Sequence, residues 1–287
     1  MKLRNFKQLG TAAILTAVLA LNSCQKEEVI APKKPTTTVT PPADITAATF
    51  GRVDAMQNDL MMLAYALTDP NFNKAEGVLS CATVTRDEVS MPHHAIIDFG
   101  TGCSDGDGIV RSGRVDVYYN FDTNSELRNN AGSQVSAIFT AFAQGDVTYD
   151  GTATLVNQGH GGDFHNVFDI SVNATIVDAA ASETVSLSGS NAFEFTRGYE
   201  TGDKNDDALS VTGSLSGDIN GHAYTAAITG SNPLIKYRMQ GCDEHYVKGE
   251  MVYTYASDPT EYIDYGDGTC DNQAIKTVNG NSQTITL

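Results

Sequence analysis

Hydrophobic residues recur at three- or four-residue intervals over 45–67, with acidic and amide residues on the opposite side. This spacing predicts an amphipathic helix. Asp44 suits the N-cap position, and Pro70 lies just beyond the expected end. The polar side lacks clustered basic residues, so we expect the helix to pack on a sheet rather than lie on a membrane. The apolar positions are Ile45, Phe50, Val53, Met56, Leu60, Leu63 and Leu67.

After Lys74 the pattern changes to short runs of β-branched and aromatic residues, separated by Gly, Asn and Asp. Such runs predict strands, and the Asn-Gly pairs in INGHAY and TVNGNSQ predict hairpins. Short connections make neighbouring strands antiparallel. We therefore expect a mainly β fold: an antiparallel meander of about a dozen strands in a curved or partly rolled sheet, with the N-terminal helix packed on it. A closed barrel and a sandwich are the alternatives.

The segment MKLRNFKQLGTAAILTAVLALNSC combines a basic start with an apolar run of about ten residues. That run is too short for a membrane-spanning helix, which needs about 20 apolar residues. The pattern is typical of a secretory signal peptide, here 1–23. The residues LNSC resemble a bacterial lipobox, which implies that Cys24 becomes the lipidated first residue of the mature chain. An ordinary signal peptide with a chance cysteine is the alternative.

The residues after Cys24 indicate where the chain is displayed. Gln25, Lys26, Glu27 and Glu28 resemble the export tag of surface lipoproteins in the Bacteroidota, which implies the outer leaflet of the outer membrane. The next segment, VIAPKKPTTTVTPPA, has the Pro-rich composition of an extended tether. We therefore divide the chain into a signal peptide (1–23), a lipidated Cys with a Pro/Thr-rich tether (24–43) and a single β-rich domain (44–287).

The chain is strongly acidic, with a formal net charge of −17. Removal of the signal peptide takes away Lys2, Arg4 and Lys7 and no acidic residue, which makes the mature chain more negative still. Nucleic acids and anionic membrane surfaces are bound by clustered Lys and Arg. The composition therefore argues against both partners and leaves the lipid anchor as the expected link to the membrane.

Four cysteines follow Cys24, and an even number in an exported chain indicates disulfides. Four cysteines allow three pairings. Their order favours Cys81 with Cys103 and Cys242 with Cys270, because each pair brackets a short meander of strands. A four-thiolate zinc site and free buried thiols are the alternatives, although the C-x-x-C spacing typical of zinc sites does not occur.

Each of two cysteines is preceded by a similar segment. Ile97-Asp98-Phe99-Gly100 and Ile263-Asp264-Tyr265-Gly266 lie a few residues before Cys103 and Cys270. With these segments the chain resembles a group of Bacteroidota surface lipoproteins that carry IDFGTGC near the middle and IDYGDGTCDN near the end. The resemblance implies a β-rich protein anchored at the cell surface. Because the segment is repeated, we expect Asp98 and Asp264 to accept backbone hydrogen bonds in two equivalent turns.

The sequence contains no G-x-S-x-G, no H-E-x-x-H and no P-loop, so it shows no recognisable catalytic motif. Calcium is the one cofactor that it suggests, because oxygen ligands alternate along two acidic loops. Solvated acidic turns are the alternative, since neither loop continues as an EF-hand. The candidate ligands are Asp105 and Asp107 in the first loop, and Asp203, Asn205 and Asp207 in the second.

Tyrosines gather near the C-terminus, where Tyr253, Tyr255 and Tyr262 could form a binding face for sugar rings or a protein partner. Packing in the core is the alternative role. Together these features predict a lipoprotein of the outer-membrane surface that binds a glycan or protein without catalysis, as an adhesion or accessory module. The other hypothesis is a surface hydrolase that uses dispersed carboxylates, assisted by calcium.

Overall fold

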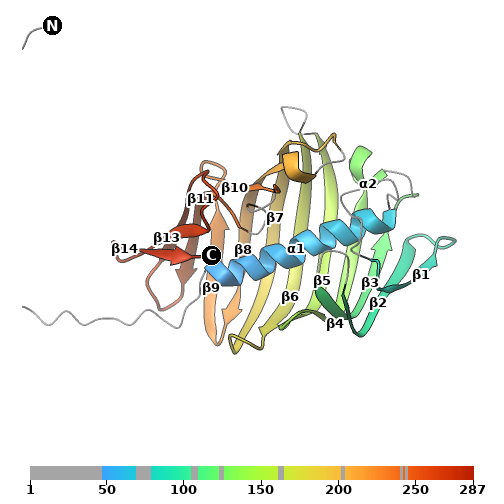
Figure 1. The fold of residues 1–287 in the computed structure, drawn as a ribbon, viewed down its shortest axis with the longest axis horizontal. Coiled ribbons are helices and arrows are strands. Elements are labelled where there is room, and N and C mark those ends of the chain that lie inside the picture. The colour runs from blue at the N-terminus through green and yellow to red at the C-terminus, as the bar shows by residue number, and fades with distance from the viewer. Residues whose placement is uncertain are drawn as a thin grey trace, which may run out of the picture. The chain divides into compact units, whose positions relative to one another are not determined.

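Fourteen strands pair into one antiparallel sheet, with a long helix on one of its faces (Figure 1). The structure is a computed structural model and describes residues 47–68, 79–104, 109–122, 126–160, 165–201, 204–239, 242 and 245–287. The mainly β meander expected from the sequence is confirmed. The strands are β1 (Thr83–Asp87), β2 (His93–Ser104), β3 (Val110–Tyr119), β4 (Gln134–Gln144), β5 (Val147–His160), β6 (Asn166–Asp178), β7 (Glu183–Arg197), β8 (Ala208–Ile219), β9 (His222–Ile228), β10 (Leu234–Tyr237), β11 (Lys248–Tyr255), β12 (Glu261–Asp267), β13 (Gln273–Val278) and β14 (Asn281–Thr286).

Strand order follows chain order from β1 to β8 and from β10 to β14. The exception lies at β9 and β10, which both pair with β8 on one side and with β11 on the other. These two strands therefore occupy one position in the sheet, and 229–233 interrupts it. Among the described strands, no pairing joins β1 to β14, so the path of the sheet is open and has two edges.

The two faces of the sheet differ sharply in burial. Along β6, buried Phe168, Ile170 and Val172 alternate with partly or fully exposed neighbours, and β7 repeats this pattern. We call the buried side the inner face and the opposite side the outer face. The outer face of the central strands carries a row of small hydroxyl side chains at matched register: Thr154, Ser171, Ser190 and Ser214. One dry and one solvated face is usual for an antiparallel sheet.

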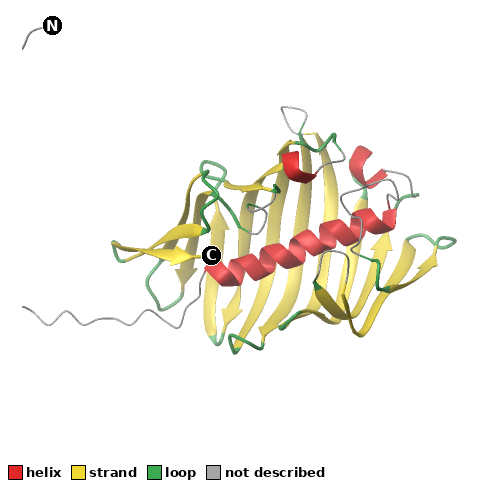
Figure 2. Ribbon diagram, in the orientation of Figure 1, coloured by secondary structure: helices red, strands yellow, loops and turns green. Residues whose placement is uncertain are grey.

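The long helix α1 (Ala47–Thr68) crosses the strands on the inner face, as Figure 2 shows. Its ends agree closely with the predicted 45–67. Val53, Met56, Leu60 and Leu63 of the predicted apolar stripe are buried, and Tyr65 meets Phe168 of β6 edge to face at 6.2 Å between ring centroids. No helix of the described residues has the length and apolar character needed to cross a membrane.

Several polar side chains of α1 are also buried, and the sheet supplies partners for them. Lys236 of β10 donates a hydrogen bond to Asp54 at 2.6 Å, and Asn191 of β7 donates one to Gln57 at 3.1 Å. Arg111 of β3 approaches Asp59 at 3.2 Å. A buried charge is costly unless it is paired and hydrogen-bonded. These contacts therefore fix the position of α1 along the inner face.

Candidate functional site

The two repeated segments form equivalent turns, as expected. The Asp98 side chain accepts a hydrogen bond from the Gly100 amide at 2.7 Å, and that of Asp264 accepts one from the Gly266 amide at 2.9 Å. Both glycines have positive φ, +60° and +95°, which a residue with a Cβ rarely adopts. Strand register shifts next to Asp98 and next to Asp264. The segments are therefore bulges stabilised by an aspartate, which is a structural role.

Both disulfides predicted from the sequence are present. Cys81 and Cys103 join the start of the β1–β2 hairpin with a Cα–Cα distance of 5.8 Å, and Cys242 and Cys270 are joined at 5.3 Å. Disulfides that close loops of this size stabilise a fold by about 3 kcal/mol in the chain-entropy view. The second bond ties the segment before β11 to the turn between β12 and β13.

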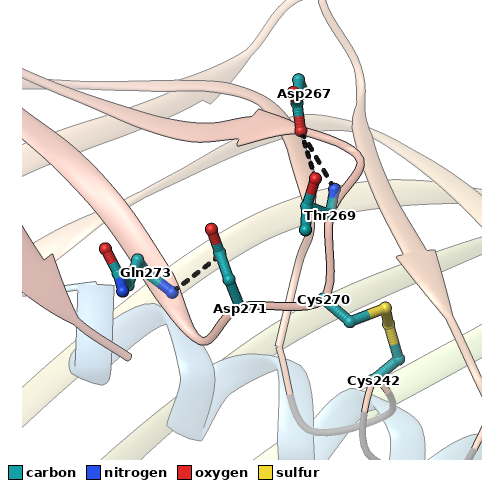
Figure 3. The surroundings of a disulfide bond; sticks show 6 residues. All are labelled: Cys242, Asp267, Thr269, Cys270, Asp271 and Gln273. Atoms are coloured by element: carbon teal, nitrogen blue, oxygen red, sulfur yellow. Dashed lines mark hydrogen bonds between the residues drawn. A yellow bond between two sulfur atoms is a disulfide. The ribbon is translucent and has the colours of Figure 1, made fainter. Parts of the chain in front are cut away.

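This turn is held by local hydrogen bonds, shown in Figure 3. The Asp267 side chain accepts from the Thr269 amide at 3.2 Å and from the Thr269 hydroxyl at 2.7 Å. These bonds lower the pKa of Asp267, with the Thr269 hydroxyl as the largest cause. Asp271 accepts from the Gln273 amide at 3.2 Å. The turn is thus fixed on both sides of Cys270.

A surface hollow of about 510 Å³ lies beside this turn. Asp264, Ile275 and Thr284 stand side by side in its wall, at matched register on β12, β13 and β14. Ile275 is 46% exposed, and Tyr262, which precedes Asp264 on the same face of β12, is 43% exposed. The described part of its lining offers carboxylates, hydroxyls, an amide and apolar surface, and includes no basic residue: Asp264, Gly266, Asp267, Thr269, Asp271, Gln273, Ala274, Ile275 and Thr284.

The prediction that Tyr253, Tyr255 and Tyr262 share one exposed face is wrong, because only Tyr262 is exposed. Tyr253 and Tyr255 point to the inner face and are buried, so the alternative of core packing is confirmed for them. Tyr253 is paired with Glu261 and Val252 with Tyr262, which puts Tyr262 on the outer face. Paired residues on adjacent strands share a face, and successive residues of one strand alternate between faces. Tyr262 therefore lies on the same face as Val252, opposite to Tyr253 and Tyr255.

The structure covers only part of the predicted calcium loops. Asp105, Asp107 and Asp203 lie outside the described residues. Asn205 is exposed in the short helix η2 (Lys204–Asp206), whereas the Asp207 carboxylate is buried with Arg238 Nη1 at 3.8 Å. A cation next to Asp207 does not favour a second cation there. Within the described parts of the chain, no three His, Cys, Asp or Glu side chains are arranged to hold a metal ion.

Cys24, the tag of Gln25, Lys26, Glu27 and Glu28, the signal peptide and the tether all lie outside the described residues. They stay predictions from the sequence.

A second outer-face cluster on β2 and β3 was missed from the sequence. Asp116 accepts two hydrogen bonds from Arg114, at 2.6 and 2.7 Å, and contacts His94 at 3.0 Å. The bonds from Arg114 are the main reason why the pKa of Asp116 is lowered. The His94 ring stacks on Tyr118 at 4.4 Å between ring centroids. Strand pairing brings these residues together, and spacing in the sequence gave no sign of it.

Four histidine rings each face a carboxylate rather than a nucleophile. His93, His94, His165 and His222 contact Asp122, Asp116, Glu194 and Asp258, at 3.0 to 3.4 Å. A hydrolytic triad would require a serine or cysteine on the second nitrogen of such a ring. Among the described residues, no serine or cysteine takes that position beside any of the four rings.

Comparison with protein-family models, with curated proteins and with solved structures finds no match to this chain.

Proposed function

We propose that the protein is a lipoprotein of the outer-membrane surface that binds a neutral glycan, without catalysis, in the hollow beside β12, β13 and β14. The anchor part of this proposal is supported by the sequence: the signal peptide, Cys24, the acidic export tag and the tether. The resemblance to Bacteroidota surface lipoproteins with IDFGTGC and IDYGDGTCDN segments agrees with it.

The observation that carries the binding proposal is the composition of the hollow. Sugar rings present apolar C–H faces and hydroxyl edges, and sites that bind them combine apolar surface with hydrogen-bonding groups. Ile275 and the neighbouring Tyr262 offer exposed apolar surface. Asp264, Asp271 and Gln273 offer polar oxygen and nitrogen atoms. The carboxylates disfavour an anionic ligand, so a neutral glycan is the favoured class.

The hollow also has a rigid frame. The bulge at Asp264, the hydrogen bonds of Asp267 and Asp271, and the disulfide at Cys270 hold its wall before any ligand arrives. A binding surface that is already ordered loses less conformational entropy on association. This arrangement supports recognition by a preformed site.

The test of binding is a glycan screen with the purified mature protein, followed by calorimetry on the best ligand. We expect Tyr262→Ala to weaken binding at least about tenfold, since exposed tyrosines often dominate such contacts. Tyr118→Ala, on β3 of the same face, is the matched control and should leave the affinity unchanged. Equal affinity of wild type and Tyr262→Ala would place the ligand elsewhere. Repeating the screen with EDTA tests the predicted calcium loops at Asp105 and Asp203.

The test of anchoring uses two variants in the native host. Cys24→Ala should abolish labelling by palmitate. Replacement of Lys26, Glu27 and Glu28 by Ala should keep the label but protect the protein from protease added to whole cells. Unchanged protease sensitivity of the second variant would contradict the sorting function of this tag.

A further inference from the structure

Two charged side chains lie in full burial on the inner face beside the hollow. Glu261 begins β12 and Lys276 lies in β13, and each side chain is 1% exposed. Glu261 is paired with Val278 and Ile263 with Lys276, so the two residues are diagonal neighbours on adjacent strands. Lys276 Nζ lies 2.9 Å from Glu261 Oε2. The strands therefore hold an amine against a carboxyl group inside the core.

The geometry of this contact differs from that of the other buried lysine. Lys236 Nζ donates a hydrogen bond to Asp54 at 2.6 Å and faces the Tyr246 ring at 5.6 Å. Lys276 Nζ makes no hydrogen bond of normal geometry with any described residue, although Glu261 is within reach. Taking two charges out of water costs free energy even when they attract each other. Conversion of the pair into a neutral amide would remove that cost.

We propose that Lys276 and Glu261 condense to form an intramolecular amide bond. A proton first passes from the ammonium to the carboxylate, which gives a neutral amine and a neutral acid. Lys276 Nζ then attacks Glu261 Cδ, so that an N–Cδ bond forms and the bond from Cδ to the protonated oxygen breaks. That hydroxyl leaves with one proton of Nζ as water. The step needs no oxidant, metal or cofactor, and fixed proximity replaces an activating group.

Tyr255 is placed to assist this step. Tyr253 of β11 is paired with Glu261, so Tyr255, the next inward residue of β11, is a diagonal neighbour of Glu261. The Tyr255 hydroxyl group is buried on the inner face. Burial and, next, the charge of Glu261 raise the pKa of Tyr255, so the phenol keeps its proton. A protonated phenol at this position can donate a hydrogen bond to the carboxyl oxygen on which negative charge develops during attack. Tyr253 lies in the same buried layer and its ring stacks on that of Tyr255 at 6.4 Å between centroids, which helps to exclude water.

The expected product is a cross-link between β12 and β13, towards the end of this hairpin away from the turn that holds Cys270. Unlike the disulfide, the amide would survive reduction. It would hold the β12–β13 hairpin closed whether or not the disulfides are intact.

The test is peptide mapping of the mature protein after reduction and denaturation, with a protease that cuts before aspartate. Cuts before Asp258, Asp264 and Asp271 place Glu261 and Lys276 in two different peptides unless the side chains are linked. We expect one branched peptide that contains both Glu261 and Lys276, with a mass about 18 Da below the sum of its two parts, the mass of the released water. Trypsin should fail to cut after Lys276. Lys276→Arg should give separate peptides of full mass, whereas Lys236→Arg should keep the branched peptide. Tyr255→Phe should increase the fraction that is not linked.

The peptide map of the wild-type protein alone shows whether the amide bond between Glu261 and Lys276 is present. Separate, full-mass peptides carrying Glu261 and Lys276, from protein whose disulfides show that it is folded, would overturn the proposal and leave an ordinary ion pair. A branched peptide that persists in Lys276→Arg would assign the link to another residue and overturn it as well.

Discussion

Asp98 and Asp264 illustrate how a residue's position in a turn decides its role. Each is acidic, exposed and next to an aromatic residue, a setting that could equally suit a catalytic carboxylate. Each instead accepts one backbone hydrogen bond from a glycine two residues later. The role depends on an oxygen acceptor at the end of a short side chain rather than on negative charge.

We predict that Asp98→Ala and Asp264→Ala each lower the free energy of unfolding by about 1 kcal/mol, the usual net value of one hydrogen bond. Asp→Asn at the same positions keeps the acceptor oxygen and should cost less than half as much. Urea unfolding at neutral pH measures both changes. Equal losses for the Ala and Asn variants would show that charge, rather than the hydrogen bond, stabilises the turn.

The repeated turn could be predicted from the sequence because all its parts lie within four residues. The side on which a tyrosine falls could not. Alternation separates Tyr253 from Val252 within one strand, but the register between β11 and β12 decides that Tyr262 points outward. That register depends on a bulge near Gly249 and on the following turn, whose geometry the hydrophobic pattern does not specify.

At the scale of elements, the extent of α1 could be predicted from the sequence, but its contacts could not. Its ends were predictable from periodicity, the N-cap candidate and Pro70. The partners of its polar residues were not, because Lys236 and Arg111 lie 182 and 52 residues away from Asp54 and Asp59. Helical periodicity identifies the polar side of a helix but carries no information about whether a distant strand supplies a matching charge.

Variants of Asp59 and Arg111 test how much their contact stabilises the packing of α1 on the sheet. Both side chains are buried, and Gln144 also donates a hydrogen bond to Asp59. We predict that Asp59→Ala lowers the free energy of unfolding by about 3–5 kcal/mol, because it removes the carboxylate that faces the buried Arg111 charge. Arg111→Met should cost a similar amount.

The double variant Asp59→Ala/Arg111→Met is the informative comparison. It removes both charges, so its loss should be smaller than the sum of the two single losses by more than about 1 kcal/mol. Chemical denaturation of all four proteins gives the cycle. Additive losses would mean that the two side chains do not stabilise α1 through each other.

At the scale of the whole molecule, the inner face concentrates the aromatic residues of the protein. Tyr65, Tyr246 and Tyr253 are fully enclosed, and burial is the largest cause of the raised pKa of each. Burial likewise raises the pKa of Tyr199 and of Tyr224 to about 12. In the unfolded chain, a tyrosine titrates near 10.

We predict that the fold is lost cooperatively in alkali. A tyrosine whose pKa is higher in the folded chain than in the unfolded chain does not reduce stability below pH 10, near the pKa of the unfolded chain. The free energy of unfolding then falls as the pH rises from about 10 towards 12. The loss approaches about 1.4 kcal/mol per pH unit for each such tyrosine. Tyrosinate absorbance and circular dichroism, recorded together, should change over the same pH interval. Ionisation of these five tyrosines with unchanged circular dichroism would contradict their burial.

The placement of α1 has a mechanical consequence. The helix is the first described element of the chain, and it crosses the strands of the inner face (Figure 1). A load that enters the described chain at Ala47 therefore passes into α1 before it reaches any strand. The contacts of α1 with β3, β7 and β10 would share that load at once. Unzipping a strand from an edge would instead break pairs one at a time. A protein held by its N-terminal side against flow would thus be loaded through a helix that three strands hold.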